Sequence, residues 1–321
     1  MRNAAVRAQL LDNTIFDGGS GKRATKFNKL GGTDHPLTDN RLFAEMEAIS
    51  MMAIVCYSGG HSSALTAIEA VRKYGKENVI LLNHDISSHV EHADIKRFKH
   101  DVADYLDLDI TYANADNFEE MTPLEVARKK RGFQVGNGQC FCTSYLKTEP
   151  FMKWLKNNYP SAPFEPRNDI TVLYGFDMNE QHRIQRRIGI LSAQGYATDY
   201  PLALWDRTIE RTEDIGINRP ITYRVYKHAN CVGCLKSKKQ HWYCVYCLRP
   251  DIFTEAKAAE LELGHSIING GFLEEFESQF KEMRDEKGIC PSQKMSSQTF
   301  WAEVRRRMPG ERDILPCDCA F

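Results

Sequence analysis

The stretch AIVCYSGGHSSALTAIEAVRKY, residues 53–74, decides the fold class of this chain. Residues 53–57 are a short apolar run that suits a β-strand, and residues 64–74 place apolar side chains at helical spacing. Gly59 and Gly60 lie between them, and glycine lets a chain turn sharply from a strand into a helix. We therefore expect a strand, a glycine-rich turn and a helix, in that order.

Strands and helices continue to alternate after this stretch. Residues 78–82, 110–112 and 170–175 are predicted strands. Residues 91–106 predict an amphipathic helix with one apolar face, formed by Ile95, Phe98, Val102 and Tyr105. This order predicts an α/β fold with a mostly parallel, covered sheet, and such sheets bind ligands at the carboxyl ends of their strands.

The sequence suggests three regions. Residues 1–50 carry glycine-rich loop signals and a short predicted helix around 42–49, and we expect an accessory N-terminal arm. Residues 51–222 hold the α/β pattern and form the expected nucleotide-binding domain. Residues 223–321 form the expected Cys-rich C-terminal extension, with predicted helices at 252–263, 271–287 and 299–307.

The composition is that of an ordinary globular protein. The 321 residues are 42% hydrophobic and 26% charged, with a net charge of −1. This balance argues against non-specific nucleic-acid binding by the whole surface. No apolar run reaches the about 18 residues of a membrane span, and no apolar segment follows the charged N-terminus. We expect a cytoplasmic protein in a reducing compartment, without a membrane partner.

The turn Ser58-Gly59-Gly60-His61-Ser62-Ser63 has the chemistry of a phosphate-binding loop. Backbone N–H groups at a helix N-terminus attract anions, as does the helix dipole. The three serine hydroxyls can donate to phosphate oxygens. The turn is not a Walker loop, because no lysine follows its glycines. A simple glycine turn between strand and helix is the alternative reading.

The stretch from Val55 to Ala64 resembles the PP-loop, usually written SGGxDS, of the ATP pyrophosphatases and phosphoadenosine phosphosulfate (PAPS) reductases, with Ser62 in place of the aspartate. Three later segments, in the same order, are similar to the elements Cys-x-x-x-x-Lys-x-x-Pro, Gly-Ile-Arg-x-x-Glu-x-x-Arg and Tyr-Pro-Leu-x-x-Trp of the PAPS reductase-like branch: 142–150, 175–183 and 200–205. The resemblance implies an adenine nucleotide alpha hydrolase-like core that binds ATP or PAPS at Ser58–Ser63.

Charged residues in these segments are the candidate catalytic groups. Lys147 and Arg183, with Arg186 and Arg187, can offset phosphate charge, and arginine can do so with two hydrogen bonds. Asp85 follows the second predicted strand and is a candidate for holding Mg²⁺. Asp177 and Glu180 are alternatives for the same ion, and a solvated helix face is the alternative role for any one of these charges.

Ten cysteines in a chain of this kind indicate metal or redox chemistry rather than disulfides. Two groupings are open. In the first, the pairs Cys231/Cys234 and Cys244/Cys247 form a double CxxC site that suits Zn²⁺. Nine residues separate the two pairs. In the second, Cys140 and Cys142 join Cys231 and Cys234. This grouping resembles sulfonucleotide reductases that hold a [4Fe–4S] cluster, and we favour a cluster over zinc.

Three functions follow from these features. The first expectation is an ATP pyrophosphatase that adenylates a substrate, with sulfur transfer to a nucleic acid as a possible continuation and a sulfur-donor protein as a partner. Basic and aromatic residues at 223–228 and 236–243 suit nucleic-acid contacts. The second is a sulfonucleotide reductase that uses Cys317 or Cys319, although the family's C-terminal Glu-Cys-Gly-x-His motif is absent. The third is a non-catalytic nucleotide-sensing module.

Overall fold

A computed structural model describes residues 51–134, 139–229 and 231–309. The chain divides into two compact units, residues 1–51 and 52–321, and the second unit is described below. The predicted helix at 42–49 and the thiols Cys317 and Cys319 lie outside the described residues. Every described helix is too short or too polar to cross a lipid bilayer.

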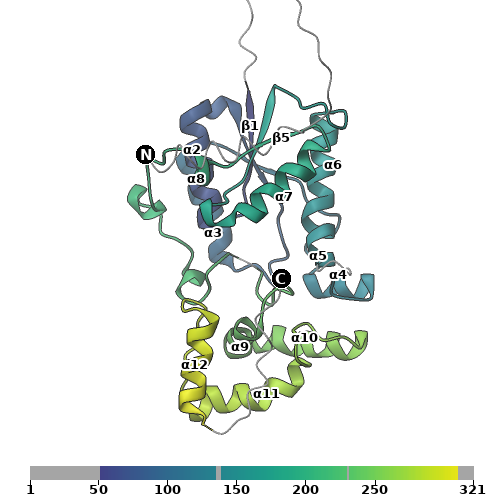
Figure 1. The fold of residues 1–321 in the computed structure, drawn as a ribbon, viewed down its shortest axis with the longest axis vertical. Coiled ribbons are helices and arrows are strands. Elements are labelled where there is room, and N and C mark those ends of the chain that lie inside the picture. Colours follow the sequence, from purple (N-terminus) through teal and green to yellow (C-terminus); the bar gives the residue numbers. More distant parts are fainter. Residues whose placement is uncertain (1–50, 135–138, 230, 310–321) are drawn as a thin grey trace, which may run out of the picture. The chain divides into compact units, whose positions relative to one another are not determined.

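The centre of the second unit is an all-parallel sheet of five strands in the order β3-β2-β1-β4-β5. Its strands are β1 (Met52–Cys56), β2 (Val79–Asn83), β3 (Ile110–Tyr112), β4 (Ile170–Leu173) and β5 (Ala197–Asp199). From β1 the chain first adds β2 and β3 on one side and later β4 and β5 on the other (Figure 1). The order therefore reverses between β1 and β4, and the predicted parallel α/β fold is confirmed.

Helices cover both faces of this sheet. Val55 of β1 faces α2 (His61–Tyr74) and α3 (Ala93–Leu106), with which it shares one apolar core. Its neighbour Ile54 points to the opposite face and shares a second core with α6 (Glu149–Asn158) and α7 (Gln181–Ser192). The alternation of side chains along a buried strand thus produces the three-layer arrangement.

The predicted helix at 91–106 is α3, but its apolar face differs from the prediction. Ile95, Phe98 and Val102 are buried as expected, whereas Tyr105 is 53% exposed and Leu106 takes the buried position. The buried stripe runs through Ile95, Lys99, Val102 and Leu106 at spacings of four and three residues, and Tyr105 lies at its exposed margin. Lys99, four residues after Ile95, lies on the same buried stripe.

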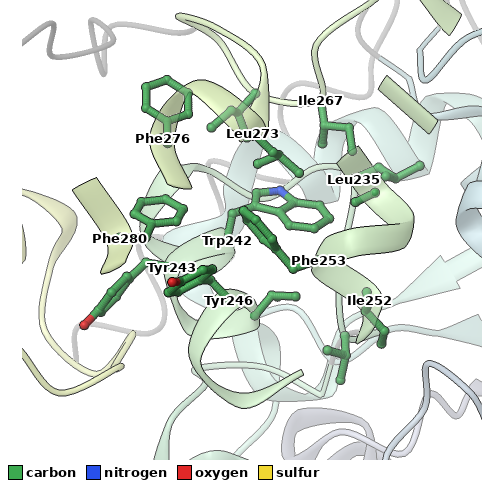
Figure 2. Close-up of a cluster of buried hydrophobic side chains, with 14 of the residues drawn as sticks. Leu235, Trp242, Tyr243, Tyr246, Ile252, Phe253, Ile267, Leu273, Phe276 and Phe280 are labelled. Atoms are coloured by element: carbon green, nitrogen blue, oxygen red, sulfur yellow. The ribbon is translucent and has the colours of Figure 1, made fainter. Parts of the chain in front are cut away.

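The C-terminal helices build a third apolar core around Trp242 and Tyr243, which Figure 2 shows with their neighbours. They are α9 (Lys239–Leu248), α10 (Pro250–Leu263), α11 (Leu273–Lys281), which continues as a π-helical turn (Glu282–Glu286), and α12 (Ser297–Arg307). Val90 and Cys140 also belong to this core. The C-terminal helices therefore pack against segments of the chain that lie between β2 and β4. The three helices predicted in this region are confirmed.

The remaining elements are short. They are the helices α4 (Pro123–Lys130), α5 (Phe141–Thr143) and α8 (Pro201–Leu204), a π-helical turn (Ser144–Thr148), and 3₁₀ turns at Lys76–Asn78, Met178–Glu180, Thr212–Ile215 and Ile221–Arg224. Local sequence explains several ends. Thr122 caps α4 through the N–H of Glu125, and Pro123 suits the first helical position.

Candidate functional site

The glycine turn lies between β1 and α2, at the carboxyl edge of the central strand. Gly59 adopts a left-handed conformation with φ of 73°. A Cβ atom at this position would lie 2.6 Å from Cγ of Lys99, so only glycine fits. Gly60 has an ordinary φ of −91°, and a Cβ there would lie 3.5 Å from its nearest neighbour, the Tyr223 hydroxyl. The strict need for glycine therefore falls on Gly59.

The three serines of the turn have different surroundings. Ser63 is buried, and its hydroxyl donates to the carbonyl of Gly60 at 2.8 Å while it accepts the N–H of Ser58 at 3.2 Å. Ser58 and Ser62 are exposed. Ser63 thus fixes the shape of the turn and also accepts the Ser58 hydroxyl at 3.2 Å, so a ligand that takes the Ser58 hydroxyl must replace this contact, whereas Ser62 is exposed at the start of α2.

His61 ties the turn to a later segment of the chain. Its N–H donates to the Tyr223 hydroxyl at 3.0 Å, and its Nε2 accepts the N–H of Thr212 at 3.3 Å. Burial, together with the charge of Arg219, lowers the pKa of His61. The neutral imidazole is thereby favoured, as the contact with Thr212 requires. The contacts of Tyr223 and Thr212 were not predicted, because they lie about 150 to 160 residues from His61 and no local pattern links them.

The segment after β4 packs directly against the turn. A Cβ atom at Gly175 would lie 2.8 Å from the carbonyl oxygen of Ser62. Arg183 on α7 forms an ion pair with Glu180 and lies 4.1 Å from the ring centroid of Phe176. The arginine-bearing segment and the glycine turn therefore meet at the point where the strand order reverses, which is where open α/β sheets bind ligands.

Asp85, the candidate Mg²⁺ ligand after β2, is engaged by two ammonium groups. Its carboxylate accepts from Lys99 at 3.1 Å and pairs with Lys96 at 3.3 Å. Burial raises the pKa of Asp85, but the charges of Lys99 and Lys96 outweigh it and hold the pKa below its usual value. This pairing leaves Asp177, which is exposed at the start of α7, as the freer carboxylate beside the turn.

The charge of Lys147 acts both on the edge of the sheet and on the cysteines. Burial lowers the pKa of His84, which follows β2, and the charge of Lys147 lowers it further. Burial raises the pKa of Cys231 to about 11, and the same charge opposes this rise. Lys147 therefore places one cation within electrostatic range of both groups.

Four thiols from two distant segments influence one another electrostatically in pairs. The Cys142 thiol donates a hydrogen bond to Cys140, which lowers the pKa of Cys140 and raises that of Cys142. The charge of Cys234 acts on both Cys140 and Cys231. The N–H of Val232 donates to the carbonyl of Val90 at 2.8 Å and so holds the turn 231–234, hereafter the cysteine turn, beside the segment that follows β2.

Cys244 and Cys247 have different surroundings. Both lie on α9, and Cys244 is fully buried. Burial raises the pKa of Cys244 to about 12, with the charge of Cys247 as the second cause. The charges that act on Cys231 come instead from Lys147, Cys234, Cys142 and Glu91. Cys231 is thus linked electrostatically to Cys142 and Cys234, whereas Cys244 is linked to Cys247.

The donor set of Cys140, Cys142, Cys231 and Cys234 fits a thiolate-bound metal in its chemistry. Four sulfur ligands suit either a [4Fe–4S] cluster or Zn²⁺. Across the described residues, no three His, Cys, Asp or Glu side chains are drawn together in a metal-binding arrangement. Binding would therefore require the four thiols to close around the group.

Comparisons of the chain with protein-family models, curated proteins and solved structures found no match.

Proposed function

We propose that the chain is a PP-loop enzyme that binds an adenine nucleotide and activates a substrate by adenylation, converting ATP to AMP and pyrophosphate. One observation carries this proposal. The turn Ser58–Ser63 and the segment that begins at Gly175 touch at the boundary between β1 and β4, where the strand order reverses. A phosphate bound there would meet the N-terminus of α2 and the hydroxyls of Ser58 and Ser62.

The proposed step is nucleophilic attack at the α-phosphorus of ATP. A substrate oxygen forms the new P–O bond, and the bond from the α-phosphorus to the bridging oxygen breaks. Pyrophosphate leaves with that electron pair, and the substrate keeps AMP. The protein contributes positioning and charge stabilisation, for which Arg183 and Lys147 supply cations and the backbone of the turn supplies N–H donors.

The candidate Mg²⁺ ligands just before α7 are Asp177, which is exposed, and Glu180, which is partly buried and pairs with Arg183. Asp177 and Glu180 cap the 3₁₀ turn Met178–Glu180. Asp177 accepts the N–H of Asn179 at 2.8 Å, and Glu180 accepts the N–H of Asp177 at 3.1 Å. Together they would hold the ion, which when bound supplies positive charge to the pyrophosphate leaving group. Asp85 is less suited, because Lys96 and Lys99 already pair with it.

The four thiols support sulfur transfer as the use of the adenylated substrate. Cys140, Cys142, Cys231 and Cys234 would hold a [4Fe–4S] cluster, or Zn²⁺, which supplies a site for thiolate or sulfide chemistry. The hydrogen bond from Val232 to Val90, in the segment that follows β2, supports a location of these thiols towards the carboxyl edge of the sheet. A sulfur nucleophile that displaces AMP from the substrate completes the proposed reaction.

The test is incubation of the anaerobically purified full chain with labelled ATP and, separately, with PAPS. AMP and pyrophosphate from ATP are the expected products, in larger amounts when a candidate nucleic acid is added. Gly60→Val should lower turnover, because its methyl groups would extend beyond the Cβ position, from which Ser58 Oγ and the Tyr223 hydroxyl already lie only 3.6 and 3.5 Å away.

Gly189→Val is the matched control, since a Cβ at Gly189 has no neighbour within 4 Å. Sulfite from PAPS with a thiol reductant would replace the proposal by a sulfonucleotide reductase. Saturable ATP binding without any product would replace it by a nucleotide-sensing module. Wild-type protein that binds neither nucleotide would refute the assignment of the turn.

A further inference from the structure

Lys99 on α3 has a side chain with no exposed surface, although it carries a charge. Its ammonium donates to Asp85 Oδ1 at 3.1 Å, to Glu91 Oε2 at 3.1 Å and to Asn83 Oδ1 at 3.4 Å. Burial raises the pKa of Glu91 even though Lys99 opposes this effect. The buried group therefore consists of one cation and three oxygen acceptors below the carboxyl edge of the sheet.

Stability alone does not explain such a group. Removing two charges from water costs several kcal/mol per ion, and well-packed apolar side chains of similar volume are often equally stable or more so. Position 99 lies on the apolar stripe of α3, where a leucine or methionine would suit the pattern. The position of the charge between two functional segments offers a better explanation.

The first of these segments is the glycine turn. The aliphatic part of Lys99 fills the space beneath Gly59, where a Cβ would lie 2.6 Å from Cγ and 2.8 Å from Cδ of the lysine. The carbonyl of Lys99 also accepts the hydroxyl of Tyr57 at 2.7 Å. Tyr57 directly precedes the turn, and its own carbonyl accepts from Asn83 Nδ2 at 2.5 Å. The stem of Lys99 therefore supports the backbone from Tyr57 to Gly59.

The second segment is the cysteine turn. Glu91, which Lys99 holds, is among the charges that act on Cys231. The adjacent residue Val90 accepts the N–H of Val232 at 2.8 Å. If Glu91 moved, its neighbour Val90 would move with it, and the hydrogen bond from Val232 that anchors the cysteine turn would weaken. Lys99 is the residue that touches the supports of both turns.

From this arrangement we infer that Lys99 is a positioning residue that couples the glycine turn, Ser58–Ser63, to the cysteine turn. Its stem fixes Gly59, and its ammonium fixes Asp85 and Glu91, so that the two turns keep one mutual arrangement. The inference deepens the proposed function and rests on it for the nucleotide-dependent part. Lys99 does not contact the expected ligand itself, because the turn covers it.

The test measures amide hydrogen exchange of the full chain, first without nucleotide. Lys99→Met keeps most of the stem and removes the charge, so exchange should accelerate about ten-fold in residues 84–91 and at Val232, with less than about three-fold change at Ser58 and His61. Lys99→Ala removes both parts and should accelerate exchange in both segments. Lys96→Met is the matched control, since Lys96 also pairs with Asp85 but is 27% exposed.

Unchanged exchange in Lys99→Met, or an equal change in Lys96→Met, overturns the inference. If Lys99→Ala does not fold, Gly59→Ala probes the same contact from the other side, because its Cβ would press on Lys99 Cγ. Acceleration in both the turn and residues 84–91 is expected for this variant. A change confined to residues 57–63 would contradict the coupling.

Exchange with saturating ATP then tests the functional part. In the wild type, ATP should protect Ser58–Ser63 and also slow the exchange of Val232. In Lys99→Met, protection of the turn should remain while that of Val232 is lost. Protection of Val232 that survives in Lys99→Met overturns the coupling. Wild-type protein without any ATP protection refutes the proposed function, and the nucleotide-free comparison still decides the role of Lys99.

Discussion

Gly175 and Ser62 are in backbone contact across the boundary between β4 and α2, and a Cβ atom on Gly175 would lie 2.8 Å from the carbonyl oxygen of Ser62. The two residues follow different strands, β4 and β1, and they meet where the strand order reverses. The geometry of the proposed nucleotide site therefore depends on the absence of a single methyl group.

Gly175→Ala should weaken ATP binding. The added Cβ would force the two backbones apart, since backbone cannot give way as a flexible side chain does. We expect the Kd to rise about ten-fold, or about 1.4 kcal/mol, by titration calorimetry. Gly189→Ala on the exposed part of α7 serves as the control and should leave the Kd unchanged. An unaltered Kd in Gly175→Ala would show that ATP does not bind where Gly175 and Ser62 meet.

Tyr223→Phe should strengthen ATP binding. The Tyr223 hydroxyl accepts the N–H groups of His61 and Ala229, and so occupies one donor, that of His61, at the first turn of α2. Without the oxygen this donor is free for a phosphate, and we expect the affinity to rise about three- to ten-fold. Weaker binding would instead mean that the hydroxyl itself contacts the nucleotide. Calorimetry of both proteins under the same salt conditions distinguishes the two results.

Acid should destabilise the fold through His61. Burial and Arg219 lower its folded pKa below the ordinary value of 6.5, so the unfolded chain binds more protons between these two values. The free energy of unfolding therefore falls as the pH drops from 6.5 towards the folded pKa, and His61 adds no pH dependence above 6.5. Urea unfolding of wild type and His61→Gln across this range checks the sign.

The glutamine variant can still accept the N–H of Thr212 but does not titrate. Its stability should depend less on pH than that of the wild type in this range. Identical pH profiles for the two proteins would remove His61 as a source of acid sensitivity.

Metal content separates the two groups of cysteines. Cys231→Ser should reduce bound iron or zinc in anaerobically purified protein to less than about half of the wild-type content, because one of four ligands is lost. Cys244→Ala should retain the metal and lose about 1 kcal/mol of stability, since it removes a fully buried side chain. Elemental analysis with urea unfolding gives both quantities. Equal metal loss in the two variants would favour the double CxxC.

Local sequence predicted most of the central fold. The apolar runs of β1, β2 and β4 and the helical spacing of α2 and α3 are strong signals, because each of these elements has buried side chains, and β3 was predicted although its side chains are only partly buried or exposed. β5 was not predicted, since Ala197-Thr198-Asp199 is short and has no apolar pattern, and its extended form comes from pairing with β4. The sequence does carry a signal for Lys99, because a lysine on the apolar stripe of a helix indicates a buried charge.

The sequence by itself determined the strand–glycine turn–helix unit and the parallel α/β class, because backbone freedom at glycine and burial periodicity are local properties. Only the tertiary structure decided that Gly59 rather than Gly60 requires glycine, that Asp85 is paired with two lysines, and that Cys142 acts electrostatically on Cys231. These relationships join residues far apart in the chain. They depend on the order of strands and on side-chain packing, which no local pattern of residues encodes.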